Sequence, residues 1–301
     1  VTRSYYGLLQ AQQLLDVAEK NLGLSEKQVD LVQKKFDLGA VRKTDLLKAN
    51  VSMGQAKVEL LNRKTFLENS RRQLFNDMGM MDFGQSIIAK YSDWVPISVP
   101  TSAETLTLLK EKNPNILIQL ATIEIGKIQL KMAKGMRSPS AFASLDYSAN
   151  GDNSDELKES LKDDWRLGMN MSINFPLYSG NSLSTAQQQA ELSKRKSEND
   201  YLTFLNDLRV QVELIRKSIM NFSEIIPINQ DVVASAEEDL KLVQERYSIG
   251  SATILEVLDA QVSLIRSNST LINTIHDART QEMSLKALLG ILDLEYQTEE
   301  E

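Results

Sequence analysis

The chain has 301 residues, of which 34 are basic and 41 acidic, so its formal net charge is −7. Nucleic-acid binding needs clustered lysine and arginine, and this balance argues against a nucleic-acid partner. Cysteine is absent, which excludes disulfides, thiolate metal sites and cysteine nucleophiles. With a single histidine and no nucleotide-binding or nucleophile motif, we expect neither an enzyme nor a cofactor.

Residues 1–80 are predicted to form two long helices joined by a short break at FDLGAVRKTDLLKA. Glycine tolerates the left-handed conformation that closes a last helical turn, so Gly39 marks the end of the first helix. Arg42 stands at the next cap position, and Asp45 follows three residues later. Small and apolar residues recur before the break at the alternating spacings of a coiled-coil seam: Val1, Ser4, Leu8, Ala11, Leu15, Ala18, Leu22, Ser25, Val29, Val32 and Phe36.

The period changes to two in the middle of the chain, which predicts β-strands with one apolar and one polar face. The runs 141–150 and 165–174 have the length of membrane-spanning strands, with Trp165 at one end and Phe175 and Tyr178 at the other. A hairpin lying on a soluble core is the alternative. We favour a hairpin of a transmembrane barrel, which needs further strands, and we expect a second strand pair before Val1.

The helical pattern then returns in a second copy of the first stretch. A shift of 211 positions aligns Phe36 with Tyr247 and Gly39 with Gly250 without a gap. Thr253 and Glu256 form a capping box that restarts a helix after the second break, YSIGSATILEVLDA. The second seam runs through Tyr201, Leu205, Leu208, Val212, Ile215, Ile219, Phe222, Ile226, Asn229, Val233, Ala236, Leu240, Val243 and Tyr247. Pro227 interrupts this stretch and is expected to kink the helix or to cost about 3 kcal/mol.

A coiled-coil hairpin with a glycine tip, a β-hairpin and a second coiled-coil hairpin together resemble the TolC-like outer-membrane efflux proteins. The resemblance rests on the two tip motifs, on the passage from strand to helix at Ile173–Asn181, and on the order of the elements. It implies a mainly α fold of duplicated long coiled-coil helical hairpins plus strands of a trimeric transmembrane β-barrel. It divides the chain into a first helical hairpin (1–80), a mixed equatorial region (81–113), a helix leading to the barrel (114–138), a barrel hairpin (139–178), a second helical hairpin (179–291) and a tail (292–301).

The function that the resemblance implies is that of a passive outer-membrane exit duct in a tripartite efflux or type I secretion system. Such a duct is a homotrimer in outer-membrane lipid, lies mostly in the periplasm, and docks a periplasmic adaptor and an inner-membrane pump. The alternative is a periplasmic adaptor or a soluble coiled-coil scaffold. An adaptor usually has one helical hairpin between compact β-domains, so two tip motifs and a lipid-type hairpin count against it.

The resemblance also assigns site residues. Thr44, Asp45 and Tyr247 match the family's entrance gate, but Ala252 stands where the family has an arginine, so Arg42 or Lys43 is the candidate substitute. Glu256 and Asp259 match an acidic ring in the lumen, although Glu256 is equally well explained as a helix cap. The adaptor-docking tips are Leu38, Gly39, Ala40 and Val41 in the first copy, and Ile249, Gly250, Ser251 and Ala252 in the second. Trp165, Phe175 and Tyr178 are the membrane-interface aromatics.

Other candidate chemistry has simpler interpretations. His276 lacks a second imidazole or thiolate, so we expect a packing or surface histidine. Met78, Met80 and Met81 are soft-metal ligands in principle, but we expect them to fill the bend after a helix end. Asp163 and Asp164 are expected in a solvated loop. No nucleotide-binding or nucleophile motif occurs.

Overall fold

The computed structural model describes residues 1–80, 100–148, 158, 162 and 165–292. The expectations for Met81, for residues 81–99 of the equatorial region, for Asp163 and Asp164, and for residues 293–301 of the tail therefore lie outside the described residues. Within them no helix is both long and apolar enough to cross a membrane. The elements are α1 (Thr2–Asp37), α2 (Lys43–Asp77), α3 (Ser102–Lys112), α4 (Pro114–Gly135), β1 (Ser140–Ser148), β2 (Arg166–Asn174), α6 (Ser182–Ser248) and α7 (Ile254–Leu289).

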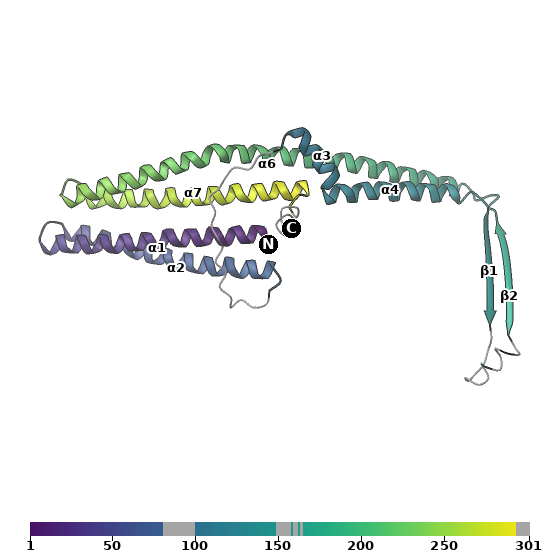
Figure 1. Cartoon of the computed structure of the whole chain (residues 1–301), viewed down its shortest axis with the longest axis horizontal. Coiled ribbons are helices and arrows are strands. Elements are labelled where there is room, and N and C mark those ends of the chain that lie inside the picture. Colours follow the sequence, from purple (N-terminus) through teal and green to yellow (C-terminus); the bar gives the residue numbers. More distant parts are fainter. Residues whose placement is uncertain (81–99, 149–157, 159–161, 163–164, 293–301) are drawn as a thin grey trace, which may run out of the picture. The chain divides into compact units, whose positions relative to one another are not determined.

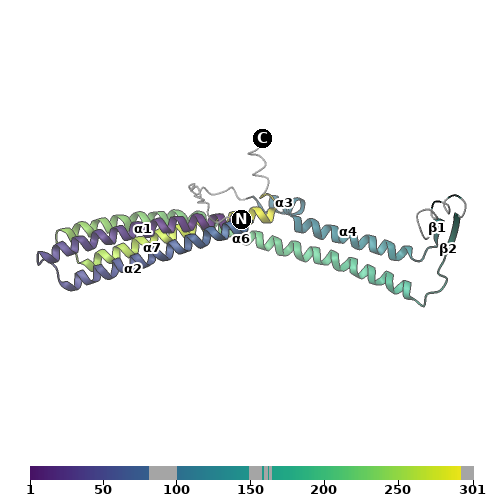
Figure 2. The same ribbon diagram turned by 90° about the horizontal axis from the view of Figure 1, so that it is seen from below.

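These elements confirm the predicted mainly α fold with a β-hairpin. They form two compact units, the first made of Val1–Leu109 with Leu208–Glu301 and the second of Lys110–Asp207. In the first unit, α1 and α2 form one hairpin, and α6 forms a second hairpin with α7 (Figures 1 and 2). The hairpins join through α1, which packs against α7 as well as against α2.

The duplication of the sequence is also a duplication of structure. Helices α1 and α6 end at Asp37 and Ser248, and α2 and α7 begin at Lys43 and Ile254, so both boundaries differ by the same 211 positions. The two helix ends carry the same hydrogen bonds. Gly39 N–H donates to the carbonyl of Phe36 at 2.8 Å, and Gly250 N–H to that of Tyr247 at 3.2 Å.

The predicted seam is the buried face of α6. Its eight buried residues are all seam members: Leu208, Val212, Ile219, Ile226, Ala236, Leu240, Val243 and Tyr247. The polar member, Asn229, donates its side-chain amide to the Thr274 hydroxyl at 3.2 Å. The helix runs through Pro227 to Ser248, and Ile226 beside it is buried against Ile275 and Ala278. This burial offsets the roughly 3 kcal/mol that an interior proline costs.

Helix α1 buries two faces rather than one. Leu8, Ala11, Ala18, Ser25 and Val32 belong to the predicted seam, and Leu9, Leu14 and Gln28 are buried in addition. The polar part of the second face pairs with α7. The Gln10 amide donates to Asn273 Oδ1 at 2.9 Å, and Gln261 Nε2 donates to Asn21 Oδ1 at 2.7 Å and to Ser25 Oγ at 2.9 Å. The contact between the two hairpins is therefore much more polar than the seam within the second hairpin.

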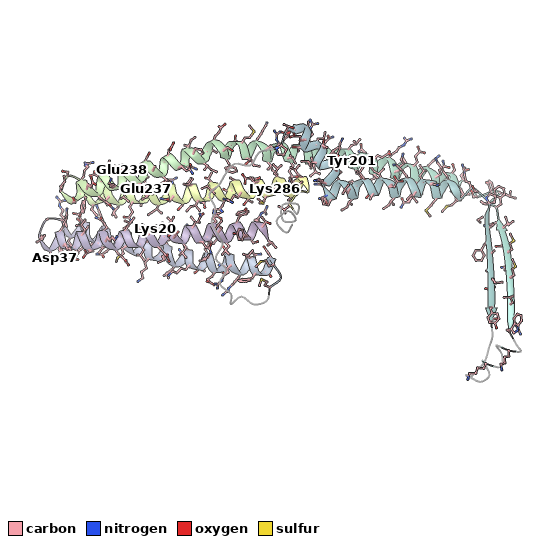
Figure 3. The ribbon with its side chains drawn as sticks, in the orientation of Figure 1. Lys20, Asp37, Tyr201, Glu237, Glu238 and Lys286 are labelled. Atoms are coloured by element: carbon pink, nitrogen blue, oxygen red, sulfur yellow. The ribbon has the colours of Figure 1, made fainter. Side chains whose placement is uncertain are left out.

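Charged side chains project along the helices (Figure 3). Lys20 lies 2.7 Å from Asp16, and Lys241 lies 3.8 Å from Glu238, each pair spanning one helical turn and more than half exposed. Exposed pairs of this kind contribute about 0.3–0.5 kcal/mol each. The buried seams, rather than these ion pairs, hold the first unit together.

Replacing Gly250 or Gly23 by alanine is expected to change stability in opposite directions, although both glycines have equal space around them. Nothing lies within 4 Å of a Cβ added at Gly250 or at Gly23, but Gly250 has φ +81° whereas Gly23 lies inside α1. Gly250→Ala is expected to destabilise its tip by about 1–2 kcal/mol, because an L-residue is strained in that conformation. Gly23→Ala is expected to stabilise α1 by about 0.5–1 kcal/mol. Hydrogen exchange of the neighbouring amides measures both changes in stability. Changes in the same direction for the two variants would contradict this prediction.

The second unit contains α4, the β-hairpin and the first part of α6. Helix α4 begins at Asn113, whose side chain accepts a hydrogen bond from Ile116 N–H at 3.0 Å, and Pro114 occupies the first turn. A Cβ added at Gly126 would lie 3.3 Å from the Cα of Lys194, so glycine permits a close approach of α4 to α6. Strands β1 and β2 are antiparallel, in a register that pairs Ala141 with Ile173 and Tyr147 with Leu167.

Candidate functional site

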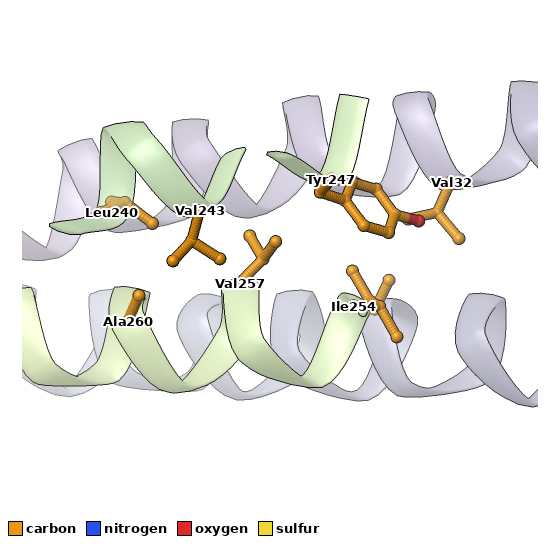
Figure 4. Close-up of a cluster of buried hydrophobic side chains, with 8 residues drawn as sticks. Val32, Leu240, Val243, Tyr247, Ile254, Val257 and Ala260 are labelled. Carbon is orange, nitrogen blue, oxygen red and sulfur yellow. The ribbon is translucent and has the colours of Figure 1, made fainter. Parts of the chain in front are cut away.

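Both tips of the first unit are anchored in one buried cluster, which we call the tip core (Figure 4). In Figure 4, Tyr247 of α6 lies close to Val32 of α1 and to Ile254 of α7. The tip core thus takes side chains from both hairpins, so it couples the two tips. Its members are Val32, Ala49, Leu240, Val243, Tyr247, Ile254, Val257 and Ala260.

Tyr247, the predicted gate tyrosine, is only 4% exposed. Its hydroxyl is buried without a hydrogen-bond partner among the described residues. The pKa of Tyr247 is raised, first because burial disfavours the phenolate and second because the Asp45 carboxylate repels it. The structure therefore brings two of the three predicted gate residues within electrostatic reach of each other, without a hydrogen bond through the phenol.

The cation that contacts Tyr247 is Lys35 of α1, which the sequence analysis did not single out. Lys35 Nζ lies 4.4 Å from the centroid of the Tyr247 ring. It also donates to the carbonyl oxygens of Tyr247, at 2.6 Å, and of Ser248, at 3.1 Å, where α6 ends. A cation is favoured there by the helix dipole and by the aromatic face. The sequence held one signal that could have pointed to Lys35. A basic residue precedes the aromatic residue in both copies, Lys35 in the first and Arg246 in the second.

The remaining gate residues lie where the second helix of the first hairpin starts. Asp45 is half-buried and accepts a hydrogen bond from Arg42 N–H at 3.2 Å, so it caps α2, while Thr44 is exposed. Ala252, at the position of the family's arginine, is half-buried against the tip core. Whether these residues control an entrance stays a prediction.

The two predicted lumen acids, Glu256 and Asp259, are both exposed near the start of α7. Glu256 Oε1 accepts from the backbone N–H and the hydroxyl of Thr253, each at 3.0 Å, and Oε2 lies 3.7 Å from Arg246 Nη2. Hydrogen bonds from Thr253 are the main cause of its lowered pKa. The predicted capping box is therefore confirmed, and the role of these acids in a lumen ring stays a prediction.

Each of the two predicted docking loops has one large aliphatic side chain that is largely exposed to solvent. Leu38 is 84% exposed and Ile249, its counterpart in the second copy, is 79% exposed. Gly39, Ala40, Gly250 and Ser251 are exposed beside them, whereas Val41 packs against the tip core, as Ala252 does. Exposed aliphatic side chains at the end of a rigid hairpin suit contact with another protein.

The β-hairpin of the second unit has the two faces that its sequence predicts. One face is apolar: Ala141, Ala143, Leu145, Tyr147, Leu167, Met169, Met171 and Ile173. The other face is small or polar apart from Phe142, which is 63% exposed. The Trp165 ring stacks on Tyr147 with centroids 6.0 Å apart at one end of the apolar face, and Phe175 and Tyr178 are exposed beyond the other end.

His276 is a packing histidine of α7, 3% exposed. Its Nε2 lies 2.7 Å from Gln13 Oε1 of α1, and its Nδ1 has no hydrogen-bond partner in the part of the chain that the structure describes. Burial, with a smaller contribution from Arg279, lowers the pKa of His276 from 6.5 to about 4. The described residues contain no group of three or more histidine, cysteine, aspartate or glutamate side chains placed to hold a metal ion.

Acid is expected to weaken the contact between α1 and α7 through His276. The pKa of His276 is lower in the folded chain than in the unfolded chain. The contribution of neutral His276 to the free energy of unfolding is therefore complete above pH 6.5 and is lost as the pH falls towards 4. The loss between pH 7 and pH 5 is about 2 kcal/mol. Unfolding at both pH values, compared with His276→Gln, isolates the effect because carboxylates common to both proteins cancel. An equal pH dependence of the two proteins would contradict it.

Comparison with known proteins shows which family has this architecture. Residues 106–291 match the model of the family described as outer membrane efflux protein. The chain is 21% identical over 300 residues to outer membrane protein TolC of Vibrio cholerae, covering 97% of this chain and 67% of that protein. It is 22% identical to TolC of Escherichia coli K12, covering 96% of this chain and 60% of that one. The chain thus spans 60–67% of the length of these two relatives.

A solved structure of the outer membrane protein VceC from Vibrio cholerae superimposes with a TM-score of 0.79 at 20% identity, covering 96% of this chain and 68% of that one. At this identity the likeness shows the fold alone. The family model spans more than half of the chain, and its family is one of outer-membrane transport proteins rather than enzymes. This chain belongs to the outer membrane efflux protein family.

Proposed function

We propose that this protein is the outer-membrane exit duct of a tripartite efflux or type I secretion system. Three copies would contribute β-hairpins to one barrel and helical hairpins to one periplasmic tunnel, which docks a periplasmic adaptor and, through it, an inner-membrane pump. The observation that carries the proposal is the strand pair with one continuous apolar face, encoded in the same chain as two helical hairpins with matching tips.

The dimensions of the hairpin support a place in lipid. Trp165 and Phe175 are ten positions apart on the same face. At about 3.3 Å per residue they are separated by about 33 Å along the strand. A strand tilted by about 40° then spans about 25 Å of bilayer, the height of the apolar band of outer-membrane barrels. We therefore expect Trp165 and Phe175 to lie at the two membrane interfaces.

The tip core suggests how the entrance would be held closed. Tyr247 packs inside it, and Lys35 ties α1 to the end of α6. The gate residues would then act by keeping the two hairpins together, not by projecting the phenol into the bore. Asp45 contributes its charge near Tyr247 and the cap of α2. Leu38 and Ile249 are the proposed adaptor contacts, because they are the bare aliphatic side chains of the two tips.

Conductance of the full-length protein in planar bilayers tests the duct and its acidic ring together. Glu256→Gln with Asp259→Asn keeps a hydrogen-bond acceptor at the α7 cap and removes two charges per copy. We expect this variant to raise the concentration of divalent cation needed for half block by about tenfold, because carboxylates gathered round one axis attract cations.

Asp277→Asn, an exposed acid further along α7, is the control and should leave the block unchanged. Unaltered block in the double variant would remove the acidic ring and leave the duct standing. A purified trimer that gives no conductance would contradict the duct itself.

A further inference from the structure

A groove lies between the two hairpins of the first unit and is lined by three helices. Its lining residues fall within 9–24 of α1 and 264–272 of α7, and Glu237 joins them from α6. The groove has a volume of about 540 Å³. Pockets that hold small molecules have volumes of about 300–1,000 Å³, so this groove is large enough for a drug-sized compound.

The apolar part of the lining is aliphatic and comes from both hairpins. Leu9 is 3% exposed, and the other five aliphatic side chains are half-buried. The six are Leu9, Val17, Leu24, Leu264, Ile265 and Ile272. A ligand with an apolar body would remove these partly exposed side chains from water, and this burial favours binding.

Two polar bonds between α1 and α7 hold the walls of the groove apart. Gln13 Oε1 lies 2.7 Å from His276 Nε2, and Gln261 Nε2 donates to Asn21 Oδ1 at 2.7 Å. Gln13 and Asn21 also line the groove, so it has a link between the hairpins on either side along α1. The site is therefore largely preformed, and a ligand does not have to separate the hairpins to enter it.

The rim of the groove carries more negative than positive charge. Asp16 and Lys20 of α1 pair with each other at 2.7 Å, so their charges cancel. Glu237 on the second hairpin is exposed, and no side chain in the described part of the chain forms an ion pair with it (Figure 3). An unpaired carboxylate beside an aliphatic surface is complementary to a cation that has an apolar body.

We propose that this groove binds an amphipathic organic cation of drug-like size, with its apolar body against α1 and α7 and its charge beside Glu237. The inference goes beyond the proposed duct, because it gives the wall of one chain a ligand site of its own. The ligand touches both hairpins and binds only while they lie together. By mass action it therefore stabilises the contact between them.

Protection of a single thiol tests the site in the full-length, detergent-purified protein, because the chain has no cysteine of its own. Asn268→Cys places the thiol in the groove, and tetraphenylphosphonium is the probe. At ten times its dissociation constant, the probe should slow alkylation by a water-soluble maleimide about tenfold. Ser263→Cys is the matched control, since Ser263 is exposed on the same helix outside the groove, and its alkylation should not change.

The charge of the ligand is tested with an anion of the same shape. At equal free concentration, tetraphenylborate should protect Asn268→Cys far less than tetraphenylphosphonium does. Adding Glu237→Gln to Asn268→Cys should raise the concentration of the cation needed for half protection about threefold. Equal protection by the two ions would overturn the proposed recognition of a cation.

Glu238→Gln is the control for Glu237→Gln and should leave the half-protecting concentration unchanged. Glu238 is the next residue of α6, but it lies 3.8 Å from Lys241 and does not line the groove (Figure 3). Equal effects of the two substitutions would show a general effect of charge rather than a contact, and would contradict the role of Glu237.

The apolar contact and its effect on the hairpins have separate readouts. Ile265→Ala should weaken protection of Asn268→Cys about tenfold, because the ligand then buries less aliphatic surface. In the parent protein, the probe at ten times its dissociation constant should slow hydrogen exchange of amides in α1 and α7 about tenfold where exchange requires the hairpins to separate. Unchanged exchange under saturating probe would overturn a ligand held between the hairpins.

The remaining outcomes identify other occupants and separate this inference from the proposed function. Protection that rises with protein concentration without the probe would assign the groove to a second copy, and protection that follows detergent concentration would assign it to detergent. Either result would overturn the proposal. An unprotected thiol in a protein that conducts would remove the ligand site and leave the duct standing. A protected thiol in a trimer without conductance would leave the site and contradict the duct.

Discussion

Tyr247→Ala is expected to destabilise the tips by about 3–5 kcal/mol, as the loss of a buried aromatic side chain does. The ring is 4% exposed, fills the tip core between both hairpins and lies under Lys35. Its removal leaves a cavity and deprives Lys35 of the aromatic face. Hydrogen exchange of amides in Val32–Ala49 and Leu240–Ala260 should rise together, because one cluster anchors both tips.

Tyr247→Phe is the matched control and is expected to change stability by less than about 1 kcal/mol. The phenol has no hydrogen-bond partner in the described structure, so its removal relieves a buried polar group rather than breaking a bond. The first copy already has Phe36 at the equivalent position. In bilayers, Tyr247→Ala should raise conductance and Tyr247→Phe should not. An open channel in Tyr247→Phe would instead assign the gate to the hydroxyl.

Met169→Lys is expected to cost about 2–4 kcal/mol per copy in the membrane-inserted state, the penalty for a lysine at the midplane of a barrel's lipid face. Met169 lies midway along the apolar face, opposite Leu145, and is 77% exposed in the single chain. In the proposed trimer, three copies would multiply the penalty. The measurement is the yield of heat-resistant trimer folded into lipid vesicles, which should fall sharply for this variant.

Asn170→Lys adds the same charge one residue further along β2, on the opposite face, and should fold into vesicles as the parent protein does. Asn170 pairs across the strands with Ser144. The contrast between the variants depends only on the two-residue period, since charge and position along the strand are nearly identical. Equal losses in both variants, or no loss in either, would contradict a one-sided lipid face.

Periodicity alone was enough to predict the seam within the second hairpin. The eight buried residues of α6 all belong to the predicted stripe, and Asn229, its one plainly polar member, pairs with Thr274. The glycines at the breaks were equally predictable: Gly39 and Gly250 have φ values of +72° and +81°, which glycine adopts without strain. Both features follow from local geometry, which repeats along the chain and leaves a visible pattern.

The second buried face of α1 was not predictable in this way. Leu9, Leu14 and Gln28 lie off the heptad stripe, and the bonds of Gln10 and Gln13 to α7 use residues that normally face water. A polar side chain gives no sign in the sequence of whether it meets solvent or a partner more than 200 positions away. For the same reason the histidine could be called packing or surface, but not assigned to Gln13.

In the candidate site, too, local features were predictable from the sequence and contacts between distant elements were not. The capping box of Thr253 and Glu256, the two faces of the β-hairpin and the exposed tips could be derived from spacing, because each depends on neighbours within a few residues. The burial of Tyr247 and its contact with Lys35 arise only when α1 comes to lie beside the second hairpin. Contacts between elements far apart in the chain obey no local period, so tertiary packing alone decided which cation lies over the ring.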